Sequence, residues 1–156
     1  MRIIITGPAA SGKDVLRKRL EANGFIYAKP YTTRPKREGE TDADYTFISD
    51  DEFAYMSSIP LFVVNGEYNG WRYGITMSDY MGSNLAVLTP EYIVMLKQMG
   101  LMENCFTILL MPDEKVRWKR LWERHDADSA DRRIEADRQQ FKDFTCYDVI
   151  ITNPYF

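Results

Sequence analysis

The stretch Ile3–Leu16, IIITGPAASGKDVL, decides the fold of this chain. Its three consecutive isoleucines predict a short buried strand, and a helical pattern follows the glycine-containing segment. Between strand and helix, Gly7–Lys13 fits the G-x-x-x-x-G-K pattern of a phosphate-binding loop. The glycines permit a tight turn, the helix N-terminus attracts an anion, and Lys13 adds a full positive charge. The alternative is a simple glycine turn, which the position of Lys13 disfavours.

Asp14 stands where such loops usually carry a serine or threonine whose hydroxyl reaches Mg²⁺. A carboxylate is also a hard oxygen ligand for Mg²⁺, so we interpret Asp14 as part of a metal shell. Aspartate is equally favoured in the first turn of any helix, and this alternative stays open.

Length and composition are typical of one soluble globular domain, with 156 residues, 45% of them hydrophobic and 28% charged. The net charge of −3 argues against a non-specific nucleic-acid binder. Cys105 and Cys146 fit no metal or redox spacing and predict free thiols in a reducing, cytoplasmic compartment. No apolar run is long enough for a membrane span, and no signal peptide precedes the first strand.

Strands alternating with helices predict an α/β protein with a mostly parallel sheet. Its five expected strands are Arg2–Thr6, Phe25–Ala28, Leu85–Leu88, Phe106–Met111 and Val149–Thr152. The intervening block has a different composition, and we interpret it as an inserted small β subdomain. It is expected to hold strands at Tyr45–Ser49 and Leu61–Asn65, a helix opened by a Ser49/Glu52 capping box, and a loop over Gly66–Gly74.

A second candidate site lies in TTRPKREGE, residues 32–40, where Arg34 and Arg37 flank a proline in a non-helical stretch. Guanidinium groups offer planar paired donors that match a dianionic phosphate. Tyr45 and Tyr73 can add hydroxyl donors. A solvated basic loop is the alternative, and the independent phosphate loop weighs against it.

These segments together resemble the guanylate kinase family. The matching runs, in the family's order through nearly the whole chain, are GPAASGKDVL (7–16), TTRPKREGE (32–40), DYTFIS (44–49), GWRYG (70–74), KRLWER (119–124), RRIEAD (132–137) and VIITN (149–153). The resemblance implies a P-loop NTPase three-layer sandwich with a five-stranded sheet. It also implies a core of residues 1–30 and 85–156, a β-rich nucleoside-monophosphate (NMP)-binding subdomain of about residues 31–77, and a helical lid of about residues 120–138.

The resemblance also assigns roles to residues. The ATP-binding residues would be Gly7, Pro8, Ala9, Ala10, Ser11, Gly12, Lys13, Asp14 and Asn153. The acceptor's phosphate would be held by Arg34, Arg37, Tyr45 and Tyr73. Catalysis would involve Lys13 and the lid arginines Arg120, Arg124 and Arg133.

The residues that would read a guanine differ from the family's pattern. Pro30, Val64 and Ile75 stand where the family has a serine, a glutamate and a hydroxyl-bearing residue. The polar candidates that could take the glutamate's place are Asn65, Glu67, Asn69 and Glu91. The family's C-terminal helix also has no counterpart before Phe156.

From these patterns we expect a kinase that uses ATP and Mg²⁺ to phosphorylate a nucleoside or deoxynucleoside monophosphate. The altered base-reading residues favour a base other than guanine. Its partners would be small nucleotides, without membrane or nucleic acid, and it would act as a monomer or homodimer. The alternatives are a guanylate-kinase-like binding module without catalysis and a kinase acting on a modified pyrimidine nucleotide. The retained Gly12-Lys13 pair and lid arginines favour the enzyme over the binding module.

Overall fold

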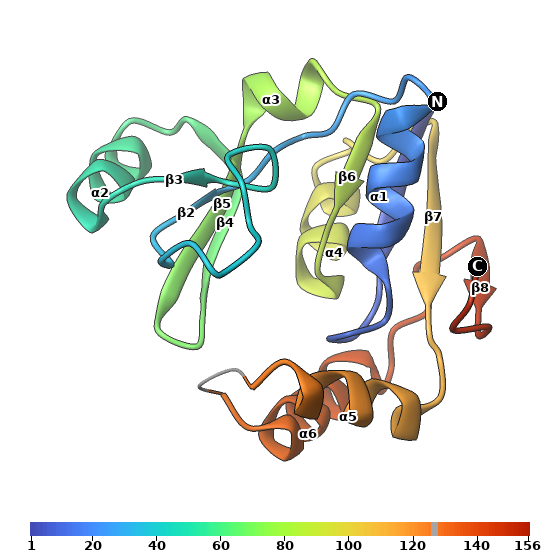
Figure 1. Cartoon of the computed structure of the whole chain (residues 1–156). Coiled ribbons are helices and arrows are strands. Elements are labelled where there is room, and N and C mark those ends of the chain that lie inside the picture. The colour runs from blue at the N-terminus through green and yellow to red at the C-terminus, as the bar shows by residue number, and fades with distance from the viewer. Residues whose placement is uncertain (126–127) are drawn as a thin grey trace.

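A computed structural model describes residues 1–125 and 128–156 of the chain (Figure 1). Its first sheet, sheet A, has the strand order β6-β1-β7-β8. The strands are β1 (Arg2–Thr6), β6 (Leu85–Val87), β7 (Cys105–Leu110) and β8 (Val149–Ile151), and all pairs are parallel. The structure therefore confirms the α/β fold with a mostly parallel sheet.

The expected strand at Phe25–Ala28 is not part of this sheet as a regular strand. A single bridge joins Tyr27 to Leu85 on the outer side of β6, and the Ala28 N–H donates to the Leu85 carbonyl at 2.8 Å. The segment is confined between Gly24 and Pro30, and a proline cannot donate to a strand ladder. Sheet A thus has four strands rather than five among the described residues.

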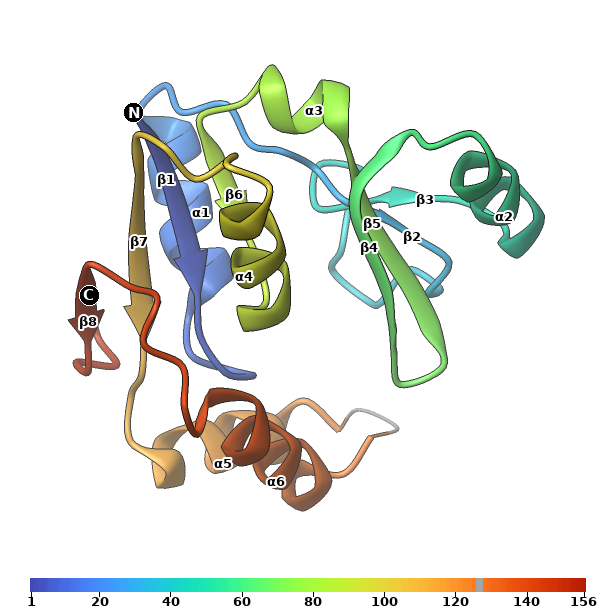
Figure 2. The ribbon, with the colours of Figure 1, turned by 180° about the vertical axis from the view of Figure 1, so that it is seen from behind.

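Helices cover both faces of sheet A (Figures 1 and 2). Helix α1 (Lys13–Ala22) packs on the face that carries Ile5 and Leu110, through Leu16 and Leu20. Helix α4 (Pro90–Gln98) packs on the opposite face with Ile93 and Leu96, where Ile4, Ala86 and Leu88 are buried. This alternation follows from the period of two along each strand.

The second sheet, sheet B, is mixed and has the order β3-β2-β5-β4. Its strands are β2 (Tyr31–Thr32), β3 (Thr46–Phe47), β4 (Phe62–Tyr68) and β5 (Trp71–Thr76), followed by the short helix α3 (Met77–Met81). The predicted loop over Gly66–Gly74 is wrong, because β4 and β5 form a hairpin across it. Asn69 and Gly70 close the hairpin with φ values of 52° and 78°. An Asn-Gly pair suits such a turn, because both residues tolerate positive φ.

Helix α2 (Asp50–Ser58) begins with the predicted capping box. The Glu52 N–H donates to the Ser49 hydroxyl at 3.2 Å, and the Ser49 N–H donates to the Glu52 carboxylate at 2.8 Å. Helices α5 (Glu114–Glu123) and α6 (Ala130–Phe141) lie together beyond the end of β1 (Figure 2). Residues 126–127, inside the expected lid, lie outside the described residues. No helix in the described ranges is long and apolar enough to span a membrane.

A buried arginine connects α1 to the segment that leads into sheet B. Arg17 is 2% exposed, its guanidinium bonds Glu21 at 2.6 Å and Asp44, and it lies 4.7 Å from the centre of the Tyr27 ring. Burial alone would raise the pKa of Asp44, but the Thr41 N–H and the charges of Lys18 and Arg17 hold that pKa below its ordinary value. The carboxylate is therefore most stabilising when it is ionised.

We expect Asp44→Asn to lower the free energy of unfolding by about 2 kcal/mol at neutral pH, because it weakens the pairing of a buried guanidinium. Since the pKa of Asp44 is lowered on folding, the difference from the parent protein should shrink as the pH falls below about 4. Urea unfolding across this pH range measures both effects. Asp42→Asn is the matched control, because Asp42 is exposed and should change stability little. Equal losses in the two variants would contradict a special role for Arg17 and Asp44.

Candidate functional site

The predicted phosphate loop joins β1 to α1 as a tight turn that only small residues allow. A Cβ atom on Gly7 would lie 2.4 Å from the Leu110 carbonyl oxygen. Gly12 has a φ of 99° and forms the N-cap of α1 without a side-chain cap. The first N–H groups of α1 therefore keep no side-chain acceptor, which is the arrangement that favours an anion at a helix N-terminus.

Lys13 and Ser11 provide polar atoms at this loop. The Lys13 ammonium donates to the Gly7 carbonyl at 2.8 Å and to the Pro8 carbonyl at 2.7 Å. The Ser11 hydroxyl oxygen is buried and has no hydrogen-bond partner among the described residues. A buried polar atom without a partner is costly and is consistent with a site that receives a ligand.

The charge state of Lys13 depends on its enclosure. Burial lowers the pKa of Lys13 to about 8, although the negative charges of Asp137 and Asp14 act in the opposite direction. Lys13 is thus protonated at neutral pH, and it loses its charge as the pH rises through about 8.

Two of the predicted lid arginines interact with the phosphate loop: Arg120 through a hydrogen bond and Arg124 through the charge of Lys13. Arg120 on α5 donates to the Ala10 carbonyl at 3.0 Å and to the Pro154 carbonyl at 2.7 Å. Arg124, at the C-terminal end of α5, is close enough to Lys13 to lower its pKa. Arg120 thereby ties α5 to the loop and to the segment that carries Asn153.

The third predicted lid arginine, Arg133, is buried on α6, with its Nε 3.7 Å from a carboxylate oxygen of Asp128. Asn153 is exposed, and its side-chain oxygen accepts the Tyr155 N–H at 2.9 Å. Leu121 and Ile134 complete the contact by packing with Ala10 of the loop. The structure therefore places Arg120, Leu121 and Ile134 of the two lid helices against Ala10 of the loop.

The predicted acceptor residues form a second cluster beside sheet B. Arg34 makes two parallel hydrogen bonds to Glu40, at 3.0 and 2.7 Å, and its guanidinium lies 5.3 Å from the centre of the Tyr45 ring. The rings of Tyr45 and Tyr73 are 6.2 Å apart. Burial raises the pKa of Tyr45 to about 12, so its hydroxyl stays a hydrogen-bond donor at neutral pH.

Arg37 is exposed, and its backbone N–H donates to Glu40 at 2.8 Å. Burial acts to raise the pKa of Glu40, but the Arg34 guanidinium and the Arg37 N–H hold it below its ordinary value. Glu40 therefore balances the arginine charge in the absence of a ligand. An incoming phosphate dianion would compete with this carboxylate for the same donors.

Asp14 follows Lys13 in the first turn of α1. Its side chain is 81% exposed, one oxygen is 3.7 Å from Arg17 Nε, and its charge contributes to the raised pKa of Tyr45. No group of three or more acidic, histidine or cysteine side chains that could hold a metal occurs in the described part of the chain. A single accessible carboxylate fits Mg²⁺, which commonly binds one or two carboxylates together with substrate phosphates and water.

The predicted base-reading positions differ in their surroundings. Val64 and Ile75 are 1% and 2% exposed and belong to the core between sheet B and α4, and Pro30 is also buried. Asn65 is exposed, whereas the Glu91 carboxylate accepts a hydrogen bond from Gln140 of α6 at 2.8 Å. The polar candidate Glu91 is thus engaged with α6.

Sequence reasoning missed several partners of the basic residues. Glu40, Asp44 and Asp137 each stand within one of the matching motifs, but the sequence predicts no ion pair for any of them. Sequence spacing could have indicated some of these partners. Arg133 and Asp137 stand four residues apart on one helix, as do Arg17 and Glu21, and side chains at that spacing are neighbours. The pairing of Arg117 with Asp137 joins two helices, and no local pattern predicts it.

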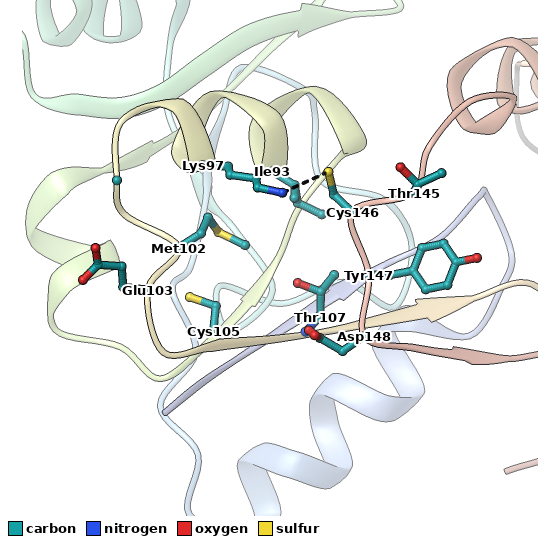
Figure 3. A pocket seen from close by; sticks show the side chains of 11 residues that line it. Ile93, Lys97, Met102, Glu103, Cys105, Thr107, Thr145, Cys146, Tyr147 and Asp148 are labelled. Atoms are coloured by element: carbon teal, nitrogen blue, oxygen red, sulfur yellow. Dashed lines mark hydrogen bonds between the residues drawn. The ribbon is translucent and has the colours of Figure 1, made fainter.

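A cavity of about 460 Å³ lies away from these clusters, at the amino-terminal ends of β7 and β8 (Figure 3). Lys97 Nζ lies 4.0 Å from Cys146 Sγ at its edge. Its described lining has one basic side chain, Lys97, and the two carboxylates of Glu103 and Asp148. This cavity therefore lacks the concentration of positive charge that a polyphosphate requires.

Comparison with known proteins identifies a family for this chain. The family model described as "Guanylate kinase" matches residues 1–156. Guanylate kinase 2, chloroplastic/mitochondrial, of Oryza sativa is 28% identical over 98% of this chain and 58% of its own length. The guanylate kinase of Enterococcus faecalis is 39% identical over 49% of this chain and 39% of its own length. The chain thus spans well under two thirds of these two relatives.

A solved structure has the same fold. The crystal structure of guanylate kinase from Anaplasma phagocytophilum matches with a TM-score of 0.74, covering 98% of this chain and 76% of that one. The sequence identity is 19%, so the likeness concerns the fold.

The burial of Lys13 predicts the pH at which its ammonium group titrates. We expect the side-chain NMR signal of Lys13 to titrate with a midpoint near 8, because burial disfavours its charged form. Comparison with spectra of the Lys13→Met variant assigns the signal. A midpoint near the ordinary lysine value of about 10.4 would show that the ammonium is solvated instead.

Proposed function

This chain belongs to the guanylate kinase family, and from that membership we propose that it transfers the γ-phosphoryl group of ATP to a nucleoside or deoxynucleoside monophosphate. The observation that supports the proposal is a chain of contacts from the phosphate loop to the cluster that holds Arg34 and Tyr45. Asp14, which directly follows Lys13, lies 3.7 Å from Arg17, and Arg17 bonds Asp44, the residue before Tyr45. Donor and acceptor phosphates bound at these clusters would meet in one space.

In this reaction an oxygen of the acceptor's phosphate forms a bond to the γ-phosphorus. The bond from that phosphorus to the β–γ bridging oxygen breaks, and ADP leaves with the electron pair. The protein's task is to position both nucleotides and to balance the charge on the transferring group. Protonated Lys13 balances charge on the donor's phosphates, while Arg34, Arg37, Tyr45 and Tyr73 hold the acceptor's phosphate.

The lid residues divide into two tasks. Arg124 and Arg133 supply positive charge above the loop, and Arg120 braces α5 through its bonds to Ala10 and Pro154. Asp14 would hold Mg²⁺, which when bound neutralises charge on the donor's phosphate oxygens. Asn153 lies at the end of the last strand, where it would adjoin the donor's base.

We infer the base of the acceptor from the missing hydrogen-bond acceptors at the base-reading positions. Val64, Pro30 and Ile75 offer no side-chain acceptor for the N1–H and amino donors of guanine. Burying such donors without partners costs about 1–3 kcal/mol each. Glu91, one of the alternative acceptors, is bonded to Gln140. We therefore expect a monophosphate whose base lacks these two donors, such as a thymine nucleotide, to be a better acceptor than GMP.

The second candidate, a binding module without catalysis, would use the same clusters. It predicts nucleotide binding without turnover. The protonated Lys13 and the two arginines Arg124 and Arg133 favour the enzyme, because charge balance at the transferring phosphoryl group is the main requirement of this chemistry.

The decisive experiment is a panel of common ribo- and deoxynucleoside monophosphates with ATP and Mg²⁺, with ADP release as the readout. We expect turnover, with a higher kcat/KM for a non-guanine acceptor than for GMP. In Lys13→Ala the turnover number should fall at least about a hundredfold, because the charge on the transferring group is no longer balanced. ATP binding without turnover for any acceptor would favour the binding module. GMP or dGMP as the best acceptor would contradict the reading of Val64.

A second prediction distinguishes binding of the acceptor's phosphate from binding of ATP. Arg37→Ala should raise the KM of the acceptor about ten- to a hundredfold and leave the KM of ATP unchanged, because a charge-assisted hydrogen bond to the acceptor is lost. Lys36→Ala is the matched control, since Lys36 is a neighbouring exposed cation paired with Asp42. Equal effects on both substrates would assign Arg37 to something other than the acceptor's phosphate.

A further inference from the structure

Asp137 is a buried carboxylate that the proposed reaction does not use. It lies on α6 and is 6% exposed. One of its oxygens, Oδ2, accepts the Ala9 N–H of the phosphate loop at 3.0 Å and a guanidinium N–H of Arg117 on α5 at 3.1 Å. Asp137 therefore joins both lid helices to the loop.

The groups facing Asp137 are basic or are backbone donors. Lys13 from the loop, Arg117 from α5 and Arg133 from α6 all act on its charge. Burial raises the pKa of Asp137, while the Ala9 N–H and these three cations act to lower it. Asp137 in turn is the strongest of the charges that favour protonated Lys13.

The groups that surround the Asp137 carboxylate are of the kind that would bind the donor's phosphates. A backbone N–H of the loop and the ammonium of Lys13 are the expected ligands of a bound polyphosphate. Two anions that share these donors in a poorly solvated space repel each other strongly. A carboxylate bonded to Ala9 and a phosphate at the same N–H cannot coexist.

We propose that the Asp137 carboxylate occupies part of the donor's polyphosphate site in the nucleotide-free protein, so that the donor must displace it to bind. This inference rests on the proposed function, because it takes the phosphate loop as the donor site. Asp137 lowers the affinity for the donor and couples donor binding to a movement of α6 away from Ala9. It selects against ligands that bring too little negative charge to break its contacts with Ala9 and Arg117.

The test measures binding of ATP and of inorganic tripolyphosphate by calorimetry, which needs no turnover. Asp137→Asn and Asp137→Ala should bind both ligands about tenfold more tightly than the parent protein, because a competing anion is gone. The asparagine variant keeps the shape of the side chain, and the alanine variant removes its acceptor as well. Thermal unfolding without ligand checks that each variant is folded.

Glu135→Gln is the matched control, since it removes the same charge from an exposed position of the same helix. It should leave both affinities unchanged. The difference in affinity between Asp137→Asn and the parent should also narrow as the pH falls, because burial raises the pKa of Asp137 and its carboxylate in the parent then takes up a proton. A purely structural Asp137 would not produce this narrowing.

The outcomes distinguish the two proposals. A parent protein that binds neither ATP nor tripolyphosphate contradicts the proposed function. A parent protein that binds both, with folded Asp137 variants that bind equally or more weakly, overturns the inference about Asp137 and leaves the proposed function standing.

Discussion

Four buried arginines, Arg17, Arg34, Arg117 and Arg133, set the constraint on which the rest of this structure depends. A buried charge is tolerated only when it is paired and hydrogen-bonded. Arg17, Arg34 and Arg117 are hydrogen-bonded to Asp44, Glu40 and Asp137 respectively. Arg133 forms an ion pair with Asp128, with 3.7 Å between its Nε and a carboxylate oxygen. Two of the pairs join parts of the chain that are far apart in sequence. Arg17 and Asp44 connect α1 to the segment leading to sheet B, and Arg117 and Asp137 connect α5 to α6.

The same constraint bears on the proposed site for two phosphate groups. Cations gathered to balance phosphates would repel one another in an empty site, and carboxylates within the protein reduce that repulsion. Glu40 does so in the acceptor cluster and Asp137 at the phosphate loop. Under the proposed function, the carboxylates of Glu40 and Asp137 would compete with nucleotide phosphates for the same cations. Carboxylates that stabilise the ligand-free protein would therefore lower its affinity for nucleotides.

The parts of the site that were predictable are those encoded in short spacings. The phosphate loop was recognisable because its glycines and Lys13 occupy fixed positions between a strand and a helix. The Ser49/Glu52 capping box was equally local, and the structure has it. The hairpin over Gly66–Gly74 was missed although Asn69-Gly70 is a strong turn signal, because the glycines on either side were interpreted as a loop.

The sequence by itself determined the α/β class, the loop and the residues expected at both clusters, because each depends on periodicity or on neighbours within one segment. Only the tertiary structure decided which charges meet. It placed Asp137 of α6 on the Ala9 N–H, buried Val64 and Ile75 in the core, and reduced Phe25–Ala28 to a single bridge. These outcomes depend on how helices and sheets pack across long sequence separations, and local pattern carries no information about that packing.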